Sequence, residues 1–141
     1  MRSAILLAVV LGLVGLHSAA ASTLAPPVIH EVFTPLPCPK NPGTTLALEG
    51  CAEKAILATD HAIDAKAKKI FGLLRTTAAR QSLVTSERAW LKYRNASCAA
   101  QASAYDGGSA QPVIDAQCLV ARNRSHLGDL AALEASLGQH G

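Results

Sequence analysis

The sequence predicts an all-α protein: an antiparallel three-helix bundle or helical hairpin array, with two disulfides and a proline-rich N-terminal lead-in. Apolar residues recur at intervals of three and four along most of the 141 residues, and no run alternates with a period of two. Six of the seven prolines lie before residue 43, and long proline-free stretches follow them. Such stretches with helical periodicity are typical of packed helices.

The first 21 residues have the three parts of a secretory signal peptide. Arg2 supplies the positive charge, an apolar stretch follows, and Ala19 and Ala21 are the small residues of a cleavage site. The apolar stretch is shorter than the roughly 20 residues that cross a membrane. We therefore expect a signal peptide at 1–21, cleavage near Ala21, and a chain that is secreted or stays in the periplasm or cell envelope. Because no cysteine precedes Cys38, we expect no stable membrane anchor.

The mature chain is expected to begin with an extended lead-in at 22–43, since proline removes a backbone donor and disfavours helix in the residue before it. Thr44 or Thr45 is then able to cap a first helix over 46–74. Its apolar stripe is formed by Ala52, Ile56, Thr59, Ile63, Ala67, Ile70 and Leu74. We interpret its acidic residues as a solvated polar face: Glu49, Glu53, Asp60 and Asp64.

A second helix is predicted over 76–105 and a third from after Ser109 to 137, which completes a helical domain at 44–138. The apolar face of the second helix contains Leu83, Val84, Trp90, Leu91, Tyr93 and Cys98. Gly107 and Gly108 form the turn between the two helices, because glycine permits positive φ. Pro112 is tolerated in the first turn of the third helix, and Gly138 ends it.

Four cysteines in a small exported chain predict two disulfides. Three pairings are possible, and the most economical joins neighbours in sequence, Cys38 to Cys51 and Cys98 to Cys118. Each would stabilise the fold by about 3 kcal/mol. The cysteine and histidine spacings do not match a zinc site, so we predict no metal and no cofactor.

Neither catalysis nor nucleic-acid binding is predicted. The net charge of +3 is too small and too mixed for a nucleic-acid surface. The pairs His61 with Asp64 and His126 with Asp129 share helix faces, and we interpret them as surface charge partners rather than parts of a hydrolase triad. No other residue set converges by spacing, so the sequence predicts no catalytic residue.

The richest stretch is 87–98, which contains the chain's one tryptophan. We interpret Trp90 as a core residue, with Arg88 or Arg94 paired to an acid, in preference to an interface anchor. From Trp90 through Tyr93 and Arg94 to Cys98, followed by the Gly107-Gly108-Ser109 turn and Cys118, the sequence resembles the bacterial lysozyme inhibitor LprI-like family. The resemblance extends from Cys38 to Leu137. It implies a small exported helical protein with paired cysteines.

The resemblance also implies a function: a secreted inhibitor that binds lysozyme and blocks its cleft without chemistry of its own. The cleft of lysozyme carries two carboxylates, so the inhibitor needs hydrogen-bond donors or positive charge. The candidate partner-binding residues are Ser109, Lys92 and Arg122, although an N-cap role of Ser109 in the third helix is the favoured interpretation. The alternative function is a structural or stress-related envelope protein with another partner.

Overall fold

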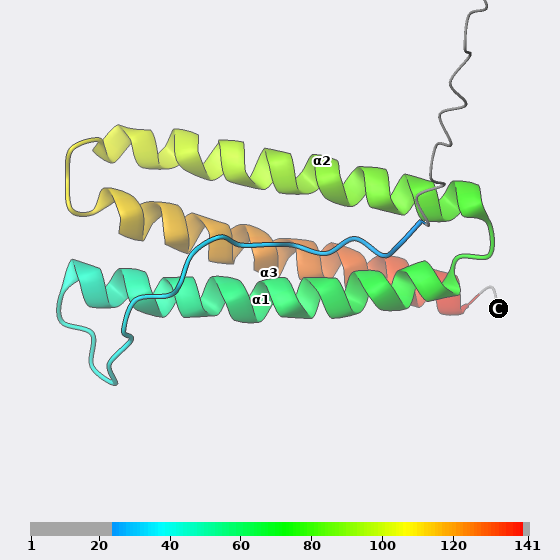
Figure 1. Ribbon diagram of the computed structural model, residues 1–141, viewed down its shortest axis with the longest axis horizontal. Coiled ribbons are helices and arrows are strands. Elements are labelled where there is room, and N and C mark those ends of the chain that lie inside the picture. The colour runs from blue at the N-terminus through cyan, green and yellow to red at the C-terminus, as the bar shows by residue number, and fades with distance from the viewer. Residues whose placement is uncertain (1–23, 140–141) are drawn as a thin grey trace, which may run out of the picture.

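A computed structural model describes residues 24–139 (Figure 1), so the predicted signal peptide at 1–21 lies outside the described residues. Within them the chain forms three helices: α1 (Thr45–Leu73), α2 (Thr77–Ala102) and α3 (Gln111–Gly138). A 3₁₀ turn, η1 (Ser103–Tyr105), follows α2, and residues 24–139 contain no strand. The prediction of three helices and no strands is confirmed. The predicted bounds are within one residue, except that the expected last turn of the second helix is η1.

Two threonines cap the first two helices in the same way. The hydroxyl of Thr44 accepts a hydrogen bond from the Ala47 N–H at 3.2 Å, and that of Thr76 accepts one from the Ala79 N–H at 3.1 Å. The third helix has no such cap. Ala110 precedes it in a helical conformation and Ser109 makes no capping bond, so the N-cap interpretation of Ser109 was wrong. Because the helix begins at Gln111, the N-cap position falls to Ala110, whose side chain has no oxygen to accept a hydrogen bond.

The third helix packs against both other helices and lies between them in Figure 1. Residues 24–37, here called the strap, are extended and pass in front of α3 on the viewer's side (Figure 1). Two backbone groups of the strap are held by carboxylates of α1: the Ile29 N–H donates to Asp64 at 2.9 Å and the Leu36 N–H donates to Glu53 at 2.6 Å. The strap thus takes a place that a fourth helix has in larger bundles.

The apolar core has two clusters along the bundle. One contains the smaller residues Ala52, Ile56, Ala116 and Val120, with Phe33 of the strap against them. The other contains the larger residues Ile63, Ile70, Leu83 and Leu130, with Ile29 of the strap against them. Five residues of the periodic stripe predicted for the first helix are therefore buried as expected, whereas Thr59 and Leu74 are half-buried.

Both disulfides form in the predicted economical pairing. Cys38 and Cys51 join the end of the strap to α1, and Cys98 and Cys118 join α2 to α3. Next to the first disulfide the backbone of the strap lies directly against the backbone of α1. A Cβ at Gly50 would lie only 2.6 Å from the Pro37 carbonyl oxygen, so a larger residue would not fit there. Among the described helices, none is long and apolar enough to cross a membrane.

Candidate functional site

A buried arginine joins all parts of the fold. Arg94 of α2 is 1% exposed. Its Nη1 donates to Asp60 of α1 at 2.8 Å and to Asn123 of α3 at 2.9 Å, and its Nη2 donates to Glu31 of the strap at 2.5 Å. Its Nε donates to the neighbouring Asn95 at 2.9 Å. We call these five residues the Arg94 cluster, and its bonds satisfy a charge that would otherwise be costly to bury.

Two carboxylates share this one guanidinium. One oxygen of Asp60 accepts from both Arg94 and Asn123, whereas the other, Oδ2, is buried without a hydrogen-bond partner among the described residues. The pKa of Asp60 is raised from 3.8 to about 6, chiefly because the carboxyl is buried; Arg94 and Asn123 oppose the rise and nearby Glu31 adds to it. The interpretation of Asp60 as part of a solvated face was therefore wrong. Asp60 follows Ile56 by four residues and precedes Ile63 by three, which is the spacing of the buried stripe.

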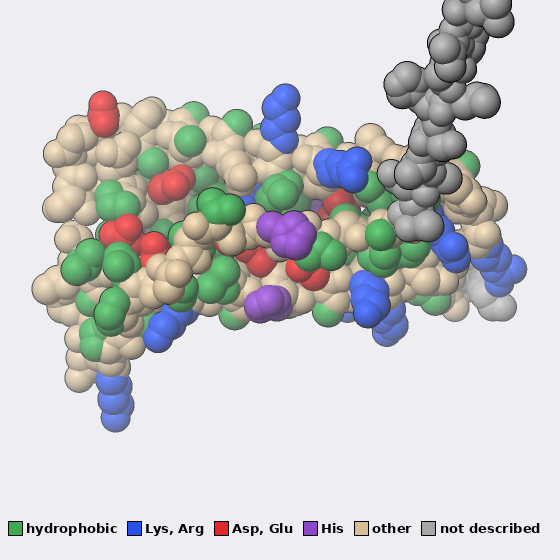
Figure 2. Space-filling model, viewed as in Figure 1, with side chains coloured by type: hydrophobic (Ala, Val, Ile, Leu, Met, Phe, Trp, Pro, Cys, Tyr) green, Lys and Arg blue, Asp and Glu red, His purple; other side chains and the backbone are tan. Residues whose placement is uncertain are grey.

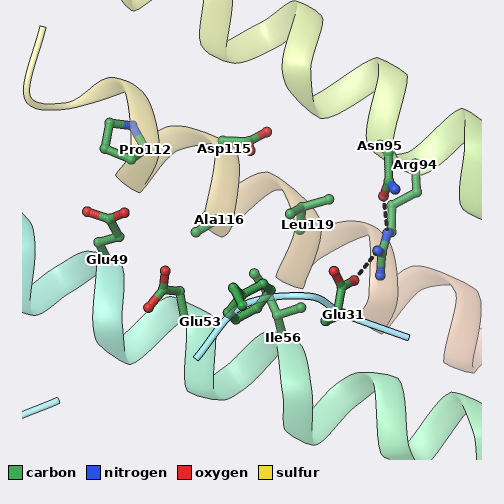
Figure 3. Close-up of a pocket in the computed structure, with 11 residues that line it drawn as sticks. Glu31, Glu49, Glu53, Ile56, Arg94, Asn95, Pro112, Asp115, Ala116 and Leu119 are labelled. Carbon is green, nitrogen blue, oxygen red and sulfur yellow. Dashed lines mark hydrogen bonds and ion pairs between the residues drawn. The ribbon is translucent and has the colours of Figure 1, made fainter. Parts of the chain in front are cut away.

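An acidic pocket of about 390 Å³ opens beside the Arg94 cluster (Figure 3). Glu49 and Glu53 project from α1, Asp115 lies on α3 opposite them, and Glu31 closes the end next to Arg94 (Figure 3). The floor is apolar and is made by Phe33, Ile56, Ala116 and Leu119. Burial raises the pKa of Asp115, and Arg94 opposes that rise. Figure 2 shows several acidic side chains on the left half of this face, where α1 begins, and others nearer its middle.

The net charge of this pocket decides which ligands it is able to hold. Arg94 is already shared by Asp60 and Glu31, so the remaining carboxylates leave the pocket negative. Residues 24–139 contain no group of three or more Asp, Glu, His or Cys side chains placed to hold a metal ion. A partner that presents carboxylates would be repelled here.

A second buried polar group lies next along α2. The rings of Trp90 and His126 are stacked with centroids 3.8 Å apart, and His126 Nε2 is 2.8 Å from a carboxylate oxygen of Glu87. Trp90 is partly buried beside the larger apolar cluster, in line with its interpretation as a core residue. The interpretation of His126 and Asp129 as surface partners was wrong, because His126 lies on the same buried face of α3 as Leu130.

A family model described as lysozyme inhibitor LprI matches residues 38–130. The chain belongs to the LprI lysozyme inhibitor family. No curated protein and no solved structure matches it. The part matched by the LprI family includes all four cysteines and the Arg94 cluster except for Glu31, which lies on the strap.

The structure separates the three candidate contact residues of this LprI chain. Ser109 is exposed in the turn before α3, and Arg122 is partly buried about 16 Å along that helix from its first residue, Gln111. Lys92 is exposed on α2. It lies two residues from buried Arg94 and hence on nearly the opposite side of the helix. No hydrogen bond or ion pair between described residues joins any two of the three.

Arg122 does gather other groups around it. Its Nη2 donates to the hydroxyl of Ser97 at 3.2 Å, and its guanidinium lies 5.6 Å from the centre of the Tyr93 ring. Tyr93 was expected on the apolar face of α2 but is 56% exposed, so that expectation was wrong. Tyr93 directly precedes the buried Arg94, and a step of one residue turns the side chain by about 100° around the helix. Asp60, Glu31 and Asn123 were not predicted as partners of Arg94, and only Asp60 had a signal in the sequence, its spacing along the apolar stripe.

Proposed function

We propose that this protein is a secreted inhibitor of lysozyme that binds the enzyme and blocks its cleft without catalysing a reaction. The observation that carries the proposal is the LprI family match over 38–130, which contains both disulfides and most of the helical fold. Rigid crosslinked helices support it, because a preformed surface loses little conformational entropy on binding.

We propose that the chain acts outside the cytoplasm, in the periplasm, at the cell envelope or after release. Its two disulfides support this location, because disulfides persist in oxidising compartments. The proposed route is a signal peptide at 1–21 that is removed near Ala21. The proposed division of the mature chain remains a lead-in at 22–43 and a helical domain at 44–138.

We propose Arg122, Lys92 and Ser109 as the residues that meet the enzyme, with Arg122 as the principal contact. Arg122 uses one of its five N–H donors on Ser97, so others are free for a carboxylate. The negative pocket beside Arg94 supports the choice of another surface, because it would repel the carboxylates of a lysozyme cleft.

The test is lysis of bacterial cells by a chicken-type lysozyme, with and without the oxidised mature protein. We expect dose-dependent protection that falls after reduction of the disulfides. The change Arg122→Ala should reduce protection most, followed by Lys92→Ala and Ser109→Ala. Arg124→Ala is the matched control, because Arg124 is an exposed arginine two residues further along α3.

Helicity is checked for each variant by circular dichroism. Absence of protection at large molar excess of a helical, oxidised sample would contradict inhibition of this class of lysozyme. Equal protection by all three variants and the unsubstituted protein would refute the contact residues and leave the inhibition intact.

A further inference from the structure

A groove of about 350 Å³ runs between α2 and α3 on the side of α3 away from the acidic pocket. Leu119 lines the pocket and Ala121 lines the groove. Residues two positions apart on a helix point in nearly opposite directions. The groove is lined by Gln101, Ile114, Gln117, Cys118, Ala121, Arg122 and Ser125. None of these side chains carries a negative charge.

The guanidinium of Arg122 is uncompensated in this groove. It is partly buried, and the described residues form no ion pair with it. The bond to Ser97 uses one donor and leaves the rest of the planar fork unused. The unused donors at this partly buried position match the geometry of a carboxylate, so the arginine is able to bind an anion here.

Tyr93 does not line the groove itself, but it lies beside Arg122, which does. Tyr93 is 56% exposed as a residue, and its ring lies under the Arg122 guanidinium. An arginine stacked on an aromatic ring is held in one orientation, which lowers the entropy lost when the arginine binds a partner. Exposed Tyr and Arg side chains are also the residues most enriched among strong contacts in protein interfaces.

We infer that the groove between α2 and α3 binds a carboxylate of a protein partner, with Arg122 as the anion-binding residue and Tyr93 as the residue that positions it. A carboxylate fits better than a phosphate, because a single arginine matches one negative charge and no second basic residue lines the groove. The inference rests on the proposed function only in naming lysozyme as the partner that supplies the carboxylate.

The first experiment measures the Kd of lysozyme by calorimetry for a set of variants. We expect Arg122→Ala to weaken binding by roughly tenfold or more and Tyr93→Ala by roughly threefold to tenfold. Tyr93→Phe keeps the ring and should bind as the unsubstituted protein does, and Arg122→Lys should bind weakly because it lacks the planar fork. Arg124→Ala is the control and should change little.

Binding by the unsubstituted protein with Arg122→Ala and Tyr93→Ala both within twofold of it would overturn the inference. A loss with Tyr93→Phe as large as with Tyr93→Ala would overturn the positioning role of the ring.

The second experiment separates the groove from the identity of the partner. A short peptide with one glutamate, the same peptide with glutamine, and inorganic phosphate are titrated into the labelled protein and followed by nuclear magnetic resonance. Saturable shifts at Gln117, Arg122 and Ser125 with the glutamate peptide alone would support the groove, even if lysozyme does not bind. No shift, equal shifts with glutamine, or a response to phosphate only would overturn it.

Discussion

Two arginines of similar chemistry have opposite surroundings in this fold. Arg94 is 1% exposed and is shared by two carboxylates and two asparagines, drawn from the strap and all three helices. Arg122 is partly buried, bonds to one hydroxyl and lies beside an exposed tyrosine. The difference teaches that charge alone does not mark a binding residue. A fully paired arginine holds the structure together, and an unpaired one is free to meet a partner.

The largest expected effect is the loss of the buried arginine. Arg94→Ala leaves Asp60 and Glu31 without their cation, and breaking a buried ion pair costs about 3 to 5 kcal/mol. Urea unfolding followed by circular dichroism measures this change in the free energy of unfolding. Arg122→Ala, a change of the same size, should alter it by about 0.5 kcal/mol or less. Equal losses in the two variants would break the comparison.

Removal of the crosslink between the helices that carry the arginines comes next. Cys98 and Cys118 are 20 residues apart, and replacing both with Ala should lower the free energy of unfolding by about 3 kcal/mol. Because Cys118 lines the Arg122 groove, lysozyme binding should also weaken. The matched change at Cys38 and Cys51 should cost similar stability and leave lysozyme binding unchanged. Equal loss of lysozyme binding in both double variants would count against the groove.

A smaller effect is expected from pH, and it should come from the two aspartates whose pKa is raised, Asp60 and Asp115. The folded-state pKa of Asp60, about 6, is above the ordinary value of 3.8, so the folded state binds this proton more tightly. This group therefore destabilises the fold at neutral pH, and its contribution to the free energy of unfolding rises by about 1 kcal/mol from pH 7 to pH 5. Asp60→Asn should remove this part of the pH dependence and leave the part that comes from Asp115. Urea unfolding at both pH values measures it, and an unchanged pH dependence in the variant would refute the raised pKa.

The smallest expected effect on stability comes from salt, which should distinguish the two arginines by function. Raising sodium chloride from about 50 to 500 mM shortens the Debye length several-fold and screens exposed charges more than buried ones. Lysozyme binding through Arg122 should therefore weaken by several-fold, while the stability cost of Arg94→Ala should change little. Calorimetry and urea unfolding at the two salt concentrations measure both. A salt-independent Kd would place the contact elsewhere.

Helix periodicity in the sequence is sufficient to predict three helices, because the apolar stripe of α1 repeats over about six turns and Pro42, Gly43, Gly107 and Gly108 mark two of the helix boundaries. The disulfide pairing also follows from proximity in sequence. The Arg94 cluster could not be predicted in this way, since Arg94 meets Asp60 34 residues away and Glu31 63 residues away. Polar residues on a stripe are usually assigned to the surface, which is why Asp60 and His126 were misplaced.

The stack of Trp90 on His126 gives the protein a built-in optical signal. The chain has one tryptophan, and its indole ring lies against a side chain of α3. Its emission therefore reports whether α2 and α3 are docked, without any attached dye. In the oxidised chain the Cys98–Cys118 bond already holds these helices near each other. Stopped-flow fluorescence of the oxidised chain would thus measure how fast the side chains of the two helices pack. The same measurement on the reduced chain would also include the time that the helices need to come together.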